Sequence, residues 1–115
     1  MNDRQYKYLW RMEQLQKQLQ AMWQDKRVQL YNDFELPDDL DEVPSVFLAG
    51  PTSRNQLLEC NWRCEAVRLL RESGFTGWIF CPEPRGEEHP GDFTERSLIH
   101  RWESDRLLNA THVAF

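Results

Sequence analysis

The chain has 115 residues, of which 40% are hydrophobic and 12% aromatic, and its formal net charge at pH 7 is −5. This length suits one domain with a single modest core, and the aromatic content argues against a disordered chain. The negative charge argues against nucleic acid as a partner and no apolar run has membrane-spanning or signal-peptide character, so we expect a cytoplasmic protein that binds small molecules.

The first predicted element is a long helix. Residues 4–27 contain no Gly or Pro, and five apolar side chains recur at alternating spacings of four and three, namely Tyr8, Met12, Leu15, Leu19 and Met22. This heptad spacing is typical both of a helix packed on its own domain and of a short coiled coil between two subunits. The pattern therefore divides the chain into an N-terminal helix, residues 1–27, and an α/β domain, residues 28–115.

Charge is distributed unevenly between these two parts. Residues 1–31 carry six Lys and Arg against three Asp and Glu, whereas residues 32–115 carry eight against sixteen. Six of the ten residues from Asp33 to Glu42 are acidic, which predicts a solvated loop against which the basic helix or another subunit could lie. Just before this loop, residues 28–31 alternate with period two and predict an edge strand that reaches Phe34.

The central pattern of the sequence is an apolar run that ends abruptly in a turn. Residues 46–49 form a short continuous apolar run, typical of a strand buried on both faces, and the turn Gly50, Pro51, Thr52, Ser53 and Arg54 follows it. A buried strand that runs into a small-residue turn is where open α/β sheets bind ligands, because glycine lets backbone N–H groups approach an anion or sugar. The alternative is an ordinary turn without a ligand.

The next segments extend the pattern to a strand, a helix and a second strand. Residues 61–73 predict an amphipathic helix that Gly74 closes, with apolar residues on the buried face (Trp62, Ala66, Leu69, Leu70) and charged residues mostly on the other (Arg63, Glu65, Arg68, Arg71, Glu72). Residues 78–81 then predict a buried strand, which Pro82, Glu83 and Pro84 stop. A right-handed crossover makes the two strands parallel and brings both carboxyl ends to one edge of the sheet.

The last segments predict a helix and a third parallel strand. Residues 93–109 resume helical spacing through Leu98, Ile99, Trp102 and Leu107 with Leu108, and an apolar strand starts at His112. Because this third strand is a stub, we expect an incomplete sheet of about three strands plus the edge strand. Such a sheet leaves edges and helix faces uncovered, so we expect the chain to form homo-oligomers, most economically through the heptad positions of the first helix.

The cysteines and histidines do not predict a metal centre. Cys60, Cys64 and Cys81 are an odd number at spacings that fit no zinc pattern, and the three histidines are scattered. We therefore expect reduced thiols, no metal and no cofactor.

Taken together, these segments resemble the nucleoside 2-deoxyribosyltransferase-like family over about residues 28–115. The matching motifs are Val46-Phe47-Leu48-Ala49-Gly50-Pro51-Thr52, Trp62-Arg63 with Ala66 and Leu69-Leu70, Gly74-Phe75 with Gly77, Phe80-x-Pro82-Glu83-Pro84, and Trp102-Glu103 ahead of an Ala-x-x-Val-x-Phe strand. The resemblance implies a flavodoxin-like or Rossmann-like α/β fold. It also implies cleavage or exchange of the N-glycosidic bond of deoxynucleosides or their phosphates, in oligomers whose neighbouring subunits close the site.

The resemblance also assigns roles to individual residues. It makes Glu103 the general acid/base or the contact of a sugar hydroxyl, although a solvated helix glutamate paired with Arg101 or Arg106 is the alternative. Asp92 is a weaker acidic candidate. The predicted substrate-binding residues are Gly50, Pro51, Thr52, Ser53, Arg54, Pro82, Glu83, Asp92 and Trp102.

Two departures from the family pattern limit this reading. Thr111 stands where the family has an acidic residue near the start of the third strand, and the family's nucleophilic glutamate lies in a Gly-rich segment beyond that strand, which this sequence does not contain. We therefore expect no base exchange by this chain alone. The alternatives are an oligomeric interaction module built on the first helix and a nucleotide-binding protein without turnover.

Overall fold

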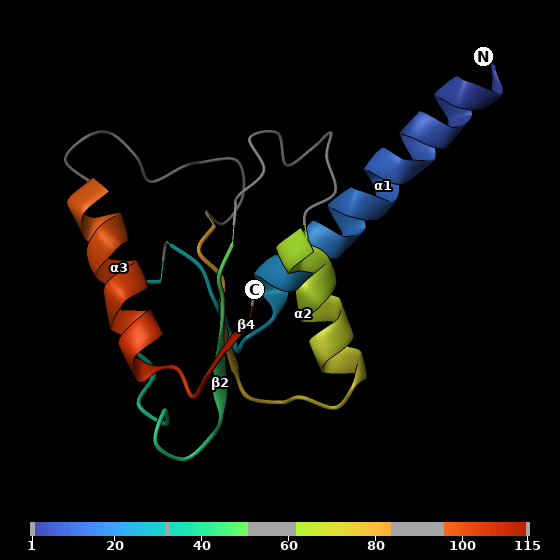
Figure 1. Cartoon of the computed structure of the whole chain (residues 1–115). Coiled ribbons are helices and arrows are strands. Elements are labelled where there is room, and N and C mark those ends of the chain that lie inside the picture. The colour runs from blue at the N-terminus through green and yellow to red at the C-terminus, as the bar shows by residue number, and fades with distance from the viewer. Residues whose placement is uncertain (1, 32, 51–61, 84–95, 115) are drawn as a thin grey trace.

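The structure is a computed structural model that describes residues 2–31, 33–50, 62–83 and 96–114. Its elements in chain order are α1 (Asp3–Gln24), β1 (Val28–Gln29), β2 (Ser45–Leu48), α2 (Trp62–Glu72), β3 (Trp78–Phe80), α3 (Arg96–Asn109) and β4 (His112–Ala114) (Figure 1). The predicted order of helices and strands is confirmed. The main difference in length is β1, which has two residues and ends well before Phe34.

The four strands form one parallel sheet in the order β1-β3-β2-β4. Val46 of β2 lies opposite Ile79 of β3 on one side and His112 of β4 on the other, and Val28 pairs with Ile79 at the β1 edge. The predicted parallel pairing of β2 with β3 and the edge position of β1 are both confirmed. The chain therefore has an α/β, flavodoxin/Rossmann-like arrangement with a long N-terminal helix.

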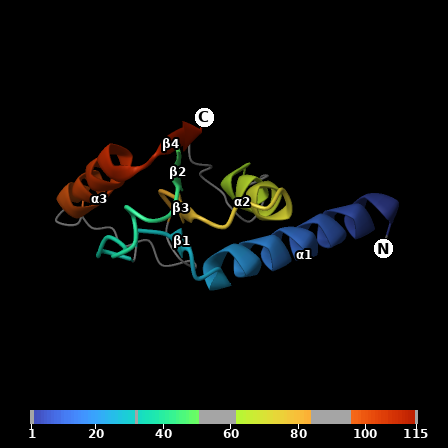
Figure 2. The same ribbon diagram turned by 90° about the horizontal axis from the view of Figure 1, so that it is seen from below.

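Helices cover both faces of this sheet (Figure 2). Alternate strand residues point to opposite faces, as the pleat of a strand requires. Val46 and Leu48 pack in a cluster with the buried residues of α1 and α2, whereas Phe47, between them, packs with Trp102 of α3. The core is thus two layers of side chains separated by the sheet.

The long first helix is only partly buried. A capping box starts α1: Asn2 Oδ1 accepts from the backbone N–H of Gln5, and the Gln5 side chain accepts from the N–H of Asn2. Leu19 and Met22 lie in the core, so the second half of the heptad pattern packs on its own domain. The first half projects past the sheet (Figure 1), and Trp10 is 61% exposed. No helix within the described ranges is both long and apolar enough to cross a membrane.

The predicted buried face of α2 is confirmed at Trp62, Ala66 and Leu70, which pack against the core, and is wrong at Leu69 and Arg63. In α2, Arg63 is buried beside Cys64 and Val67, whereas Leu69 is 52% exposed. In α3, Trp102 and Arg106 are buried, whereas Leu107 and Leu108 face solvent. The difference has one physical cause: each helix turns an arginine toward the sheet, where backbone and side-chain oxygens accept hydrogen bonds from the guanidinium, and a count of apolar residues does not reveal such an arginine.

The acidic loop is fastened to the domain rather than wholly solvated. Asp39 accepts a hydrogen bond from Trp78 Nε1 at 2.7 Å and from Arg27 Nη2 at 3.4 Å. Arg27 follows the basic helix, so the predicted approach of basic and acidic segments occurs at least within the chain. Its contacts place residues 33–42 beside the start of β3.

Candidate functional site

The topology places a switch point between β2 and β4. From β2 the chain crosses to β3 through α2 on one face, and from β3 it returns to β4 through α3 on the other face (Figure 2). Open α/β sheets bind ligands at the carboxyl ends of the strands where such connections diverge. The carboxyl end of β2 is Ala49 and Gly50, so the turn singled out in the sequence lies at the switch point.

Gly50 adopts a backbone conformation that favours glycine. Its φ is +136°, and a Cβ atom placed there would lie 3.0 Å from Cζ2 of Trp62. Its carbonyl oxygen accepts a hydrogen bond from Arg63 Nη2 at 2.5 Å. The turn therefore has a fixed start at residue 50, whereas the predicted site residues Pro51, Thr52, Ser53 and Arg54 lie outside the described residues.

Arg63 ties the ends of two strands together from inside the protein. Its side chain is 1% exposed, and Nε donates to the Leu48 carbonyl oxygen at 3.1 Å. Nη1 forms an ion pair with Glu83 Oε2 at 3.5 Å, and the guanidinium lies 4.8 Å from the ring centroid of Trp62. One buried cation thus joins the turn after β2 to the turn after β3.

The predicted residues Pro82 and Glu83 lie at the expected edge but are buried. The Glu83 carbonyl oxygen accepts from the backbone N–H of Tyr31 at 3.0 Å, while its carboxylate faces Arg63. Burial raises the pKa of the neighbouring Cys81 thiol, and the negative charge of Glu83 raises it further. The contacts of Glu83 therefore serve to hold this edge together, and Cys81 stays a thiol.

Glu103 is held by a tyrosine from the opposite end of the chain. Tyr31, which follows β1, donates its hydroxyl to Glu103 Oε1 of α3 at 2.6 Å. Burial raises the pKa of Tyr31 well above its ordinary value, and the hydrogen bond to Glu103 and the charge of Glu103 raise it further. The phenol therefore remains a donor to the carboxylate. In the part of the chain that is described, Glu103 has no ion pair with Arg101 or Arg106.

Trp102 packs against the ring of Tyr31. It is buried, its Nε1 donates to the Asp33 carbonyl oxygen at 2.8 Å, and its ring meets that of Tyr31 edge-on with centroids 5.2 Å apart. In this arrangement, Trp102 positions the ring of Tyr31, which in turn holds Glu103. The sequence reasoning missed Tyr31, although the argument that brings strand ends to one edge applies to β1 as it does to β2 and β3.

Thr111 lies at the other edge of the sheet. Its Oγ1 donates to the Ser45 carbonyl oxygen at 2.7 Å and accepts from the Ser45 N–H at 2.8 Å, so it fastens the start of β4 to the start of β2. The predicted residue Asp92 lies outside the described residues. Within the described ranges no three His, Cys, Asp or Glu side chains gather as a metal site would require.

Comparison with known proteins gave no match: no family model, curated protein or solved structure corresponds to this chain. What this edge of the sheet binds is therefore inferred from its geometry and from the motifs of the sequence.

Proposed function

We propose that the carboxyl edge of the sheet binds a nucleoside or nucleotide and that Glu103 contacts its sugar, without base exchange by this chain alone. The observation that carries the proposal is the 2.6 Å hydrogen bond from Tyr31 to Glu103 at this edge. The sequence resemblance to nucleoside 2-deoxyribosyltransferases supplies the ligand class.

The chemistry of N-glycosidic bonds explains why a held carboxylate matters. Cleavage needs a carboxylate at the anomeric carbon and an acidic group that handles the proton of the departing base. Tyr31 occupies Oε1 of Glu103, and among the described residues Oε2 has no hydrogen-bond partner. Glu103 is thus oriented by one oxygen while the other is available for a sugar hydroxyl or for proton transfer.

The buried ion pair between Arg63 and Glu83 favours a site that binds a nucleoside without cleaving it. The backbone carbonyl oxygen of Glu83 accepts a hydrogen bond from the Tyr31 N–H, but the carboxylate of Glu83 pairs with Arg63 in the interior. Glu103 therefore supplies one of the two acidic groups that exchange requires. The proposal accordingly has two parts, a nucleoside site with Glu103 at the sugar and no base exchange by this chain alone.

A melting experiment and a chromatographic assay test the two parts separately. Deoxyinosine or its 5′-monophosphate at millimolar concentration is expected to raise the melting temperature of the wild type. Incubation with deoxyinosine and adenine is expected to release no hypoxanthine above background. Release abolished by Glu103→Gln would contradict the expected lack of turnover, and the absence of any stabilisation would refute the nucleoside site.

A second candidate function is self-association through the first half of α1. Four large apolar side chains there are exposed: Tyr6, Tyr8, Leu9 and Trp10. Exposed apolar patches on a projecting helix commonly mark interfaces. Sedimentation of the wild type beside Leu9→Glu/Trp10→Glu tests the idea at residues outside the core. A wild-type oligomer that dissociates in the Leu9→Glu/Trp10→Glu variant supports self-association through α1. A wild type that is monomeric at high micromolar concentration rules it out.

A further inference from the structure

A cavity lies along the free edge of β1, separate from the candidate nucleoside site. Its volume is about 510 Å³; it is open to solvent and is lined by the end of α1, β1, residues 33–35 and the start of β3. Neither Gly50 nor Arg63 nor Glu103 lines it. A cavity of this volume is within the range that small-molecule ligands occupy.

The edge beside this cavity is closed to an added strand. The outward N–H of Val28 donates to the Asp25 carbonyl oxygen at 3.3 Å, and the outward N–H of Leu30 donates to Asp33 Oδ2 at 3.0 Å. The Leu30 carbonyl oxygen accepts from the Asp33 N–H at 2.9 Å. Because the chain satisfies these three outward groups itself, we expect side chains to contribute most of the recognition of an occupant.

One rim of the cavity is fixed through its backbone. The Asp33 carbonyl oxygen accepts from Arg106 Nη2 and from Trp102 Nε1, each at 2.8 Å, and the Glu35 carbonyl oxygen accepts from Gln29 Nε2 at 2.8 Å. These bonds hold the backbone while the side chains of Phe34 and Glu35 stay exposed, Phe34 at 60%.

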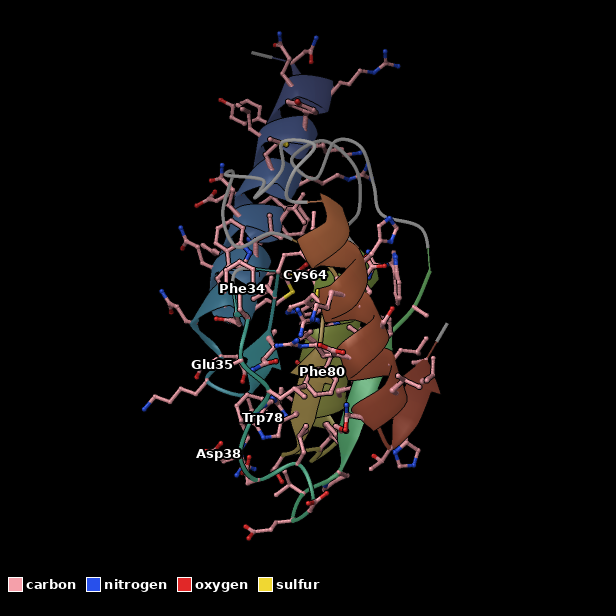
Figure 3. The ribbon with its side chains drawn as sticks, turned by 90° about the vertical axis from the view of Figure 1, so that its left-hand side faces the viewer. Phe34, Glu35, Asp38, Cys64, Trp78 and Phe80 are labelled. Atoms are coloured by element: carbon pink, nitrogen blue, oxygen red, sulfur yellow. The ribbon has the colours of Figure 1, made fainter. Side chains whose placement is uncertain are left out.

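The rest of the lining contains two further aromatic side chains, one of them held by a hydrogen bond. Trp78 is held through Nε1 by Asp39 at 2.7 Å, and it lines the cavity together with Trp23 and Phe34. Figure 3 shows Phe34, Glu35 and Trp78 along the same margin of the molecule. Three aromatic side chains from three segments therefore contribute to the lining of one open cavity.

The charge of the lining is negative. Among the described residues that line it, the carboxylates are Asp25, Asp33 and Glu35, and the basic side chain is Lys26. Arg71 compensates Asp25 through two bonds of 2.8 and 3.1 Å, whereas Glu35 has no ion pair within the described ranges. Glu35 is thus a carboxylate beside aromatic rings with no cation to neutralise it.

We propose that this cavity binds a small organic cation with an ammonium or guanidinium head group. The faces of aromatic rings are electron-rich and attract cations, and Glu35 adds a carboxylate at the exposed rim. An anionic or sugar-like ligand would gain neither interaction. The inference does not depend on the nucleoside proposal, because the two sites share no lining residue named above.

Choline and its uncharged analogue 3,3-dimethylbutan-1-ol test the role of charge, because they have the same shape. Titration of the wild type is followed by the indole N–H signals of Trp23 and Trp78 in NMR spectra. We expect choline to shift these signals and the neutral alcohol to bind at least about fivefold more weakly. Equal binding of both, or no shift with choline, would overturn the proposal.

Variants at the exposed rim test the residues. Glu35→Gln and Phe34→Leu leave the backbone bonds of the rim intact, and each is expected to weaken choline binding roughly threefold or more. Glu42→Gln and Leu36→Ala, in the same loop but outside the lining, are the matched controls and should bind as the wild type does. Equal weakening in variants and controls would overturn the assignment.

Two further arms identify the source of the cation. A lysine-containing pentapeptide that binds more tightly than choline would place the ammonium group on a polypeptide, within the same chemistry. Lys26→Gln tests whether the chain fills the cavity itself. Choline binding that occurs only in this variant would show that Lys26 is the occupant and would overturn the proposal.

Discussion

Two buried arginines on opposite faces of the sheet are satisfied in different ways. Arg63 of α2 and Arg106 of α3 are each 1% exposed. Arg63 donates to the carbonyl oxygens of Leu48 and Gly50 and forms an ion pair with Glu83. Arg106 donates to Gln29 Oε1 at 3.1 Å and to the Asp33 carbonyl oxygen, and burial lowers its pKa.

The two arginines stabilise different surfaces, the candidate nucleoside site and the cavity beside β1. Arg63, through its ion pair with Glu83, fixes the strand ends at the candidate nucleoside site. Arg106, through hydrogen bonds to neutral oxygens, fixes the rim of the cavity beside β1. A buried ion pair leaves an uncompensated charge when one partner is removed, but neutral acceptors lose only hydrogen bonds. Substitutions at the two arginines should therefore have unequal effects.

The largest effect is expected at Arg63. Arg63→Met breaks the buried ion pair with Glu83, which should lower the free energy of unfolding by about 3–5 kcal/mol in urea denaturation. The double variant Arg63→Met/Glu83→Leu removes the stranded charge and should recover part of this loss. A double variant less stable than Arg63→Met would show that the ion pair is not the source of the effect.

A smaller loss is expected at Arg106. Arg106→Met removes donors from two neutral oxygens and should cost about 1–3 kcal/mol in the same measurement. Because the Asp33 carbonyl oxygen is then held by Trp102 alone, choline binding at the cavity should also weaken. Arg101→Met, at an exposed position of the same helix, is the control. A loss as large as that of Arg63→Met would remove the distinction between the two arginines.

The smallest effect is a pH dependence at Tyr31. Its pKa is raised in the folded protein, so above pH 10, near the ordinary tyrosine pKa, the unfolded chain releases a proton that the folded chain retains. The free energy of unfolding should therefore fall as pH rises beyond 10, by up to about 1.4 kcal/mol per pH unit from this group, with no contribution below that range.

Variants isolate the contribution of Tyr31 to this slope. Tyr31→Phe should be less sensitive to pH between 10 and 11 than the wild type, while Tyr6→Phe, at an exposed position, should behave as the wild type does. Identical slopes in all three proteins would mean that Tyr31 does not hold its proton for Glu103.

The fold was predictable from the sequence where its signals are local. The apolar runs of β2 and β3 and the Gly and Pro residues beside them place these strands, and the crossover rule gives their parallel pairing. Arg63 and Arg106 were not predictable, because the oxygens that allow their burial come from Leu48, Gln29 and Asp33, which are distant in sequence.

The candidate site was predictable only in part for the same reason. Glu103 was singled out through the family resemblance, but its partner Tyr31 lies 72 positions away and has no local signal that points to it. The heptad pattern of α1 correctly indicated a helix, yet nothing in its spacing distinguishes the buried Leu19 from the exposed Tyr8.

The most direct test of the central claim is calorimetric titration of deoxyinosine into the wild type and Glu103→Gln, with Glu42→Gln as the control. A hydrogen bond between a carboxylate and a sugar hydroxyl contributes about 1.5–3 kcal/mol, so Glu103→Gln should bind roughly 10-fold to 100-fold more weakly while the control is unchanged. Measurable binding with equal affinity in all three proteins would contradict the placement of the nucleoside at Glu103.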